Sequence, residues 1–239
     1  MKFKTSITNL NNGEEIIRGH KLEELMQKKS FAEAIYLILK GELPDEKETK
    51  MFNAILTSAI DHGPGTASAL TARVVASAKN SVNTAVAAGI LAMGESHGGA
   101  TGDAGKFFQE NINTLDIASL VKDLKEKKIR IPGYGHATLT HDHRSDTLFA
   151  IAKETGMYGK HSAFAEAVFE QLKLVSSKPL PLNVDGSMAA ILSDMGFPWD
   201  VMKGIFIIAR VPGLVVHVYE EMKGDAGLRR LPEEDIEYI

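Results

Sequence analysis

Apolar residues recur at helical spacing along almost the whole chain, and this periodicity limits the fold more than any other feature. The segment SFAEAIYLILKGELP starts with Ser30 and Glu33 in capping-box spacing and stops at Gly41, before Pro44. The segment DIASLVKDLKEKK has apolar residues at i, i+3, i+4 and i+7. Further helices are predicted over 145–156, 161–176, 186–195 and 199–222. The predicted class is all-α, with at most one short strand near the N-terminus.

Length and charge exclude several classes of protein. The chain has 239 residues, enough for one large domain or two modest ones, and its formal charge of −4 gives no reason to expect nucleic acid or an anionic membrane as partner. It contains no cysteine, which excludes disulfides, thiolate metal sites and cysteine nucleophiles. We find neither an apolar run of membrane-spanning length nor a signal-like N-terminus. We therefore expect a soluble cytoplasmic protein.

One histidine-rich stretch, GYGHATLTHDHRSD, resembles a metal-binding array. It places His136, His141 and His143 around Asp142, but zinc needs three or four convergent ligands with outer-shell support. Arg144 follows at once, and its fixed positive charge disfavours a cation alongside. The sequence therefore predicts no metal site, and His141 and His143 are interpreted as solvated loop histidines.

A second stretch, GATGDAGKF, approaches a phosphate-binding Walker loop. Ala100 stands where that motif requires its first glycine, and Phe107 replaces the Ser or Thr that would hold magnesium. The motif fails at both positions. Asp103 is a suitable N-cap for a helix starting in this region, which would leave backbone amides free.

Three titratable residues at predicted loop–helix junctions suggest acid–base chemistry on carbon. His97 and His136 each follow a turn or glycine, and Asp185 precedes Gly186. Histidine and carboxylate are the groups that move a proton to and from carbon near neutral pH. Each also has a structural interpretation: a packed His97, a surface His136 and a capping Asp185. Periodicity alone does not join the three.

Four separated motifs, in order, resemble the citrate synthase superfamily. They are ESHGGA, PGYGHATLTHDHR, LNVDGSMAAILSDMGF and the downstream IIARVPGLVVHVYEE, with similar N-terminal helices in IIRGHKLEELMQKKSFAEAIYLILKGELP. The resemblance covers essentially the whole chain. It implies an all-α, citrate-synthase-like fold.

Several departures from that pattern indicate a branch of the superfamily. Helices expected between GELP and DHG are missing, and NVDG runs directly into a small-residue helix. These traits resemble citryl-CoA lyases and the citrate-synthase-like domain of ATP citrate lyase, which implies cleavage of citryl-CoA to acetyl-CoA and oxaloacetate. The alternatives are a compact citrate or methylcitrate synthase and, in another class, a non-catalytic CoA-binding partner subunit.

The resemblance implies a role for each of the three titratable residues. His136 would take the proton of the substrate's tertiary hydroxyl, His97 would stabilise the thioester enolate, and Asp185 would protonate the carbon. For His97 to donate a hydrogen bond while neutral, a nearby helix N-terminus should lower its pKa, and the setting HGGATGD permits this.

Substrate carboxylates are assigned by the same resemblance. Arg144, Arg210 and His62 would bind them in the same chain, and arginine suits this role because its planar fork accepts both carboxylate oxygens. The tail GLRRLPEED resembles a segment that donates an arginine into the neighbouring subunit's site. Arg230 is the first choice there and Arg229 the alternative.

Coenzyme A is expected as part of the thioester substrate and product, with no tightly bound cofactor. It would lie against the loop formed by Pro132, Gly133, Tyr134, Gly135 and Ala137. Its phosphates would need basic residues, for which the candidates are Lys128, Arg130 and Lys178.

The architecture implied by the family has two helical domains with the active site between them. Residues 1–98 and 187–239 would form the large, dimer-forming domain, and 99–186 the small domain on the CoA side. Ala-rich helices at 67–93 would form the core of a homodimer, although plain core packing explains these residues equally well. A separate citryl-CoA synthetase would supply the substrate of a lyase.

Overall fold

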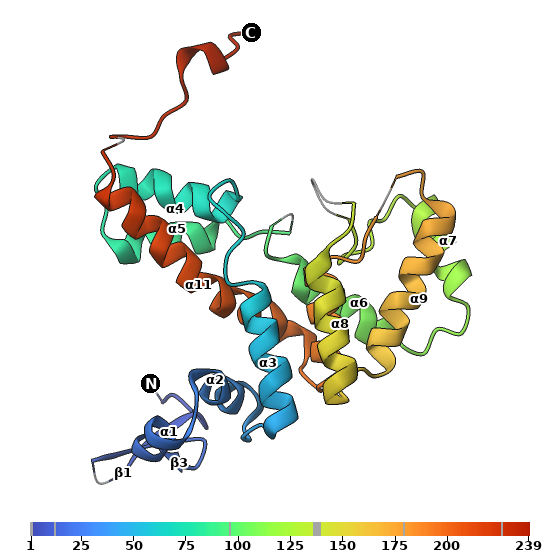
Figure 1. Cartoon of the computed structure of the whole chain (residues 1–239), viewed down its shortest axis with the longest axis horizontal. Coiled ribbons are helices and arrows are strands. Elements are labelled where there is room, and N and C mark those ends of the chain that lie inside the picture. The colour runs from blue at the N-terminus through green and yellow to red at the C-terminus, as the bar shows by residue number, and fades with distance from the viewer. Residues whose placement is uncertain (1, 12, 96, 136–139, 179, 226) are drawn as a thin grey trace.

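The computed structural model describes residues 2–11, 13–95, 97–135, 140–178, 180–225 and 227–239. Helices dominate these residues, which confirms the predicted all-α class (Figure 1). In chain order the helices and strands are β1 (Thr8–Asn11), β2 (Glu14–Ile17), β3 (His20–Lys21), α1 (Leu22–Lys28), α2 (Phe31–Lys40), α3 (Glu46–Ser58), α4 (Ala67–Ser77), α5 (Val82–Leu91), α6 (Ala100–Asn111), α7 (Ile117–Glu126), α8 (His143–Thr155), α9 (Lys160–Val175), α10 (Val184–Asp194), α11 (Trp199–Lys223) and the 3-10 helix η1 (Glu233–Asp235).

Local sequence signals set the bounds of α2. The Ser30 hydroxyl accepts a hydrogen bond from the Glu33 backbone N–H, and the Glu33 carboxylate accepts one from the Ser30 N–H. This reciprocal pair satisfies amides that the first turn leaves unbonded. Gly41 ends the helix with φ = 89°, a left-handed conformation that favours glycine. The capping box predicted from the sequence is confirmed.

The N-terminal segment differs from the expectation of one short strand. It forms a three-stranded antiparallel sheet in the order β1-β2-β3, with Thr8 opposite Ile17. Gly13 and Gly19, both with positive φ, provide the turns between the strands. This small sheet lies at one end of the molecule and leads into α1 (Figure 1).

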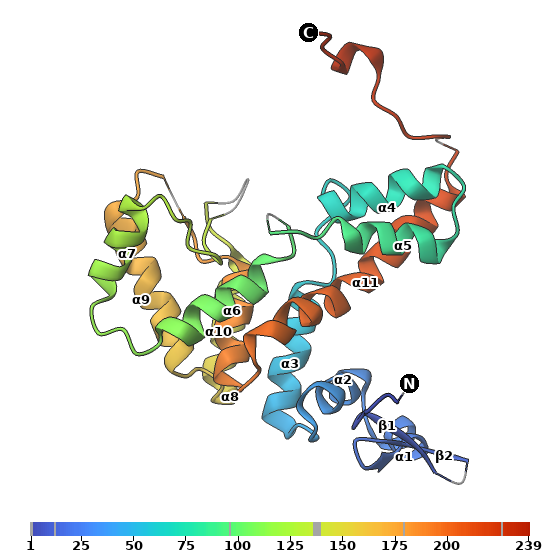
Figure 2. The ribbon, with the colours of Figure 1, turned by 180° about the vertical axis from the view of Figure 1, so that it is seen from behind.

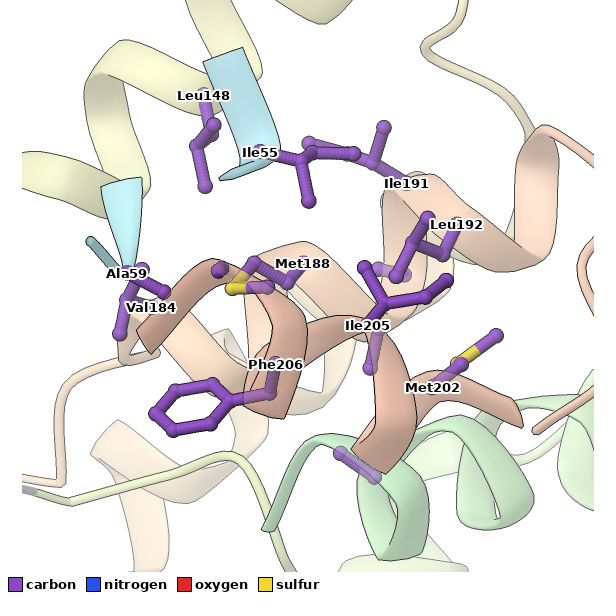
Figure 3. Packing of buried hydrophobic residues seen from close by; sticks show 14 of the residues in the cluster. Ile55, Ala59, Leu148, Val184, Met188, Ile191, Leu192, Met202, Ile205 and Phe206 are labelled. Atoms are coloured by element: carbon purple, nitrogen blue, oxygen red, sulfur yellow. The ribbon is translucent and has the colours of Figure 1, made fainter. Parts of the chain in front are cut away.

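Helix α10 is the central element of the fold. Nearly all its residues are buried, and it packs against α6, α8, α9 and α11. Figure 3 shows Met188, Ile191 and Leu192 of α10 facing side chains of α11 and its neighbours. A helix that is apolar on all sides must be surrounded, and this surrounding fixes the start of α10 in space.

The longest helix, α11, connects two groups of helices. It packs against α6 on one side and against α3, α4 and α5 on the other, as the two opposite views show (Figures 1 and 2). The division into domains at 98/99 and 186/187 stays a prediction. We note that α6 follows the first of these boundaries and α10 spans the second.

The expectation that no apolar run reaches membrane-spanning length is wrong for α11. Among the described residues this 25-residue helix is long and apolar enough to span a membrane by length and composition, with a mean hydropathy of 1.7 over an 18-residue window. In this fold the apolar side chains of α11 pack inside the protein, where Ile205, Ala209 and Leu214 are buried in the core. Core helices of globular proteins pass the same test, so the apolar content of α11 is explained by packing.

Candidate active site

A cavity of about 870 Å³ lies where several of the sequence motifs meet. Five residues predicted to act on substrate line it: His62, His97, Arg144, Asp185 and Arg210. The lining also includes the predicted CoA-contacting residues Pro132, Gly133, Tyr134 and Gly135. The structure therefore brings together side chains that are far apart in the sequence, from His62 to Arg210.

Four helices begin close to this cavity. Ser68, Thr101, Arg144 and Asp185 are each the second residue of their helices, α4, α6, α8 and α10. Backbone N–H groups in a first turn have no partner inside the helix, and the helix dipole adds partial positive charge there. Three arginines in the lining, Arg130, Arg144 and Arg210, increase this positive character. The arrangement suits an anionic ligand.

Two glycines bring the loop 131–135 against the start of α10. A Cβ on Gly186 would lie 2.5 Å from the Gly133 carbonyl oxygen, and a Cβ on Gly133 would lie 2.7 Å from the Gly186 Cα. This close approach permits backbone hydrogen bonds from Asn183 N to Gly133 O and from Gly135 N to Pro181 O. The motifs GYG and LNVDG are therefore paired.

Asp185 is positioned by this pairing at the first turn of α10. Its Oδ1 accepts a 2.6 Å hydrogen bond from the hydroxyl of Thr101, which is fully buried. Burial raises the pKa of the Asp185 carboxyl above its ordinary value. The Thr101 hydrogen bond and the charges of Arg144, Arg210 and His97 only partly oppose this rise. A carboxyl of this kind is suited to proton transfer nearer neutral pH.

His97 contacts the start of α4 through one ring nitrogen. The Ser68 backbone N–H donates to His97 Nε2 at 3.3 Å, and the Ser68 hydroxyl lies 2.8 Å from the same atom. A nitrogen that accepts from a backbone N–H has no proton, so the neutral ring carries its proton on Nδ1. Burial, aided by the charge of Arg210, lowers the pKa of His97. The ring can thus donate a hydrogen bond while uncharged.

The sequence suggested that the helix starting just after His97 would lower its pKa, but the helix N-terminus that contacts the ring is a different one. The glycine-rich stretch after His97 does start α6, but the amide that reaches the ring comes from α4, 29 residues earlier. The proposed N-cap for α6 is also wrong. Gly99 occupies the cap, and Asp103 lies inside the first turn.

Asp142 fixes the orientation of Arg144. The Asp142 carboxylate accepts from Arg144 Nε and Nη2, both at 2.9 Å, and also from the Val184 backbone N–H at 2.9 Å. Asp142 is 2% exposed. Although burial acts to raise its pKa, the Arg144 guanidinium and the two backbone N–H donors bring the pKa below its usual value. One carboxylate thus connects Arg144 to the residue before Asp185.

Arg210 and His62 also line the cavity, as do the charged residues Glu95, Asp103 and Arg130. The Arg210 Nε donates to the Ala59 carbonyl oxygen at 2.7 Å, and its guanidinium lies 5.1 Å from the Phe206 ring centroid. His62 Nδ1 lies 3.5 Å from Arg144 Nη1. Burial lowers the pKa of Arg210 from a value so high that the guanidinium keeps its charge.

Two predicted residues lie far from the cavity of their own chain. Arg229 and Arg230 belong to the C-terminal tail, which extends away from the helices beyond α4 and α5 (Figure 1). Arg229 donates from Nε to the Glu221 carboxylate at 2.7 Å and from Nη2 at 3.1 Å. Glu221 is also paired with Arg73 at 2.8 Å. Arg229 is thus engaged within its own chain.

Two predicted residues, His136 and Ala137, lie outside the described residues. The neighbouring His141 and His143 are exposed and form a surface group with Asp146, in which the possible ligand atoms lie within 4.8 Å of one another. His141 Nε2 is 2.6 Å from an Asp146 carboxylate oxygen, so a hydrogen bond between the two side chains accounts for this contact. Asp142, which the sequence placed among the array's ligands, instead faces Arg144.

Sequence reasoning missed three residues that hold the site together. Ser68 and Thr101 carry no recognisable signal, because a hydroxyl in a first helical turn is common. Asp142 was considered only for metal binding, although an aspartate just before a predicted helix is a plausible N-cap.

Comparison with known proteins agrees with this geometry. The family model described as "Citrate synthase, C-terminal domain" matches residues 1–59 and 44–231. The chain belongs to the citrate synthase family. This confirms the resemblance found in the sequence.

Among solved structures, citryl-CoA lyase from Hydrogenobacter thermophilus is similar with a TM-score of 0.94 and 50% identity, covering 99% of this chain and 94% of that one. ATP citrate lyase from Methanothrix soehngenii, in complex with citrate and coenzyme A, is similar with a TM-score of 0.86 and 26% identity, but the match spans 42% of its chain. Among curated proteins, citrate synthase 2 of Bacillus subtilis is 29% identical over 90% of this chain and 58% of its own length. The chain spans about a third of the plant ATP-citrate synthase beta chains that it matches, 34% for one from Arabidopsis thaliana.

Proposed function

We propose that this chain is a citryl-CoA lyase, a carbon–carbon lyase that forms acetyl-CoA and oxaloacetate from citryl-CoA. The observation that carries the proposal is the match to a citryl-CoA lyase across nearly the full length of both chains. The cavity supports it chemically, because it combines a carboxyl of raised pKa, a neutral imidazole and three arginines.

The reaction breaks the bond between the hydroxyl-bearing carbon of the citryl group and the methylene carbon of the thioester. His136 takes the hydroxyl proton, and the oxygen's electrons form the ketone of oxaloacetate. The electron pair of the broken bond passes to the thioester as an enolate. Asp185, in its acid form, then protonates the methylene carbon and yields the methyl group of acetyl-CoA. A positioned acid typically contributes about 10²–10⁴-fold to the rate.

His97 stabilises the enolate through the proton on Nδ1. The Ser68 N–H keeps Nε2 unprotonated, so the ring meets the developing negative charge as a neutral donor. A fixed donor of this kind is worth about 3–4 kcal/mol in the transition state. The lowered pKa of His97 is in accord with this role.

The carboxylates of the oxaloacetate portion bind Arg144, Arg210 and His62. Arg144 is held by Asp142 through Nε and Nη2, so its Nη1 edge remains for substrate and for His62. Arg210 is held through Nε by the Ala59 carbonyl oxygen. Each guanidinium is therefore oriented before the substrate arrives, which reduces the entropy lost on binding.

Coenzyme A lies along the loop of Pro132, Gly133, Tyr134, Gly135 and Ala137. Arg130 supports this placement, because it lines the cavity, is exposed, and lies near Gly135. Of the three basic candidates it is our choice for the CoA phosphates, with Lys128 and Lys178 as alternatives.

The working unit is a cytoplasmic homodimer with a large domain of residues 1–98 and 187–239 and a small domain of 99–186. Exposed apolar residues on α4, α5 and α11 support an interface there; they are Leu70, Val74, Leu91, Val216 and Tyr219. Arg230 of the tail enters the neighbouring site, since Arg229 is paired with Glu221.

Mixing inactive Asp185→Asn and Arg230→Ala subunits restores partial activity if the sites are shared, and restores none if each site is built from one chain.

The deciding experiment supplies two substrate sets to the purified protein. Oxaloacetate and acetyl-CoA released from citryl-CoA, with little net synthesis from acetyl-CoA and oxaloacetate, support the lyase. Steady release of free CoA with citrate formation supports a citrate synthase, the alternative favoured by the match to citrate synthase 2 over 90% of this chain. No turnover of either set would support a non-catalytic CoA-binding subunit and contradict both.

A further inference from the structure

A His–Asp contact lies next to the segment that carries His62 into the cavity lining. His217 of α11 places its Nε2 at 2.9 Å from Asp61 Oδ1, and Asp61 Oδ2 accepts from the Gly63 backbone N–H at 2.9 Å. Asp61 therefore closes the turn that contains His62. His217 is outside the cavity lining, whereas His62 is part of it.

Three residues on one side of α11 hold the segment 59–63. Arg210, Gly213 and His217 are spaced i, i+3 and i+7, which places them on the same helical face. Arg210 donates to the Ala59 carbonyl oxygen, and a Cβ on Gly213 would lie 2.5 Å from the Ile60 carbonyl oxygen. Only a residue without a side chain at 213 lets the segment lie this close.

The protonation of the pair follows from its contacts. A backbone N–H and His217 both bind the Asp61 carboxylate, and together with the His62 N–H they lower its pKa although burial acts to raise it. Since the carboxylate accepts, His217 Nε2 donates. The other ring nitrogen, Nδ1, is buried and has no hydrogen-bond partner among the described residues. The proton on Nε2 is therefore the one that meets Asp61, while Nδ1 makes no hydrogen bond within the described part of the chain that would hold the ring in another orientation.

We propose that His217 is a positioning residue for substrate binding: it holds Asp61, and through Asp61 it places His62 beside Arg144 in the cavity lining. The chain of contacts runs from His217 to Asp61, to the turn and to His62, whose Nδ1 lies 3.5 Å from Arg144 Nη1. This inference rests on the proposed function for its kinetic consequence, because His62 is assigned there to a substrate carboxylate.

The test uses a matched pair of histidines. His161 pairs through Nδ1 with Asp194 at 2.9 Å, and both His161 and His217 have side chains that are 11% exposed. His161 lies at the start of α9 and is not part of the cavity lining. His217→Leu, His217→Gln and His161→Leu are compared with the parent chain, and Asp61→Asn serves as a second variant if His217→Leu does not fold.

Steady-state cleavage of citryl-CoA is the first readout. We expect His217→Leu to raise KM about tenfold with kcat changed by less than about threefold, because a binding group is displaced while the proton-transfer groups stay. His217→Gln keeps an N–H donor at nearly the same reach and should restore KM to within about twofold. His161→Leu should lower the thermal midpoint and leave KM unchanged. Equal kinetics for His217→Leu and His161→Leu, or a Gln variant that behaves like Leu, would overturn the proposal.

The second readout does not depend on catalysis. The ring-proton NMR signal of His62, assigned with His62→Gln, should move in His217→Leu and Asp61→Asn but stay in place in His217→Gln and His161→Leu. If the parent chain fails to cleave citryl-CoA, the proposed function is wrong, and the NMR comparison still decides whether His217 positions His62. A His62 signal unchanged in His217→Leu would refute that positioning.

Discussion

Two carboxylates at neighbouring helix starts, Asp142 before α8 and Asp185 in α10, have opposite electrostatic environments. Asp142 accepts from a bidentate arginine and from two backbone N–H groups, and its pKa is lowered. Asp185 accepts a hydroxyl hydrogen bond from Thr101, and burial raises its pKa. The Val184 amide, one residue before Asp185, binds Asp142.

The contrast assigns a different task to each group. A carboxylate saturated with donors stays ionised and holds Arg144, whereas a carboxyl that lacks such partners can carry and release a proton. Separation of pKa values within one site is how enzymes obtain an acid and a fixed charge from the same residue type. Both residues are aspartates, so the residue type alone does not show which one stays ionised and which one transfers a proton.

The largest expected effect is on the chemical step in Asp185→Asn. Removal of the proton donor should lower the rate of citryl-CoA cleavage by about 10²–10⁴-fold, with little change in substrate affinity. Rapid-quench measurement of acetyl-CoA formation under single-turnover conditions checks this. A variant as fast as its parent would remove Asp185 from the mechanism.

Asp142→Asn should act on binding and on stability. Without the carboxylate, Arg144 loses its bidentate partner, and we expect KM for citryl-CoA to rise about tenfold. The free energy of unfolding at pH 7 should fall by about 1–3 kcal/mol, because buried donors lose a charged acceptor. Steady-state kinetics and urea denaturation provide these values.

Acid provides a control for Asp142→Asn. Since the folded pKa of Asp142 is depressed, its stabilisation is present above the unfolded pKa and is lost as pH falls through the folded value. The stability difference between parent and variant should therefore vanish in strong acid. A difference that persists there would contradict the ion-pair explanation.

The same substitution at Asp185 should have the opposite effect on stability. The folded pKa of Asp185 is raised, so burying its charge destabilises the protein at neutral pH. Asp185→Asn removes that charge and should stabilise the fold by about 1 kcal/mol. For a chain of this size that corresponds to a thermal midpoint about 2–4 °C higher. Differential scanning calorimetry at pH 7 measures it, and a lower midpoint would be inconsistent with a destabilising buried charge.

The smallest expected effect concerns Thr101. Its hydroxyl lowers the pKa of Asp185, so Thr101→Val should raise that pKa further. Because cleavage requires the protonated acid, the alkaline limb of the pH–rate profile should move to higher pH. Thr101→Ser keeps the hydroxyl and should retain the parent profile. An identical shift in both variants would exclude the hydrogen bond as the cause.

Much of the fold follows from the sequence because helical signals are local. The helix predicted over 161–176 is observed as Lys160–Val175, and that predicted over 199–222 as Trp199–Lys223. Ser30, Glu33 and Gly41 set the bounds of α2 through contacts within a few residues. The three-stranded sheet near the N-terminus was underestimated, since strands of two to four residues leave almost no periodic pattern.

The site was less accessible to sequence reasoning. The family resemblance identified His97 and Asp185 as site residues. It did not identify the groups that set the pKa values of these two side chains. Ser68 and Thr101 reach these side chains from 29 and 84 residues away, and such distances are set by packing alone. The roles of the site residues remain predictions.

The most direct test of the contrast is a carbon-13 NMR titration of the aspartate carboxyls. The signals of Asp142 and Asp185 can be assigned by their disappearance in Asp142→Asn and Asp185→Asn. The account predicts that Asp185 titrates above the ordinary aspartate pKa of about 3.9 and that Asp142 titrates below it. An Asp185 signal that titrates at or below that value would contradict its assignment as the proton donor.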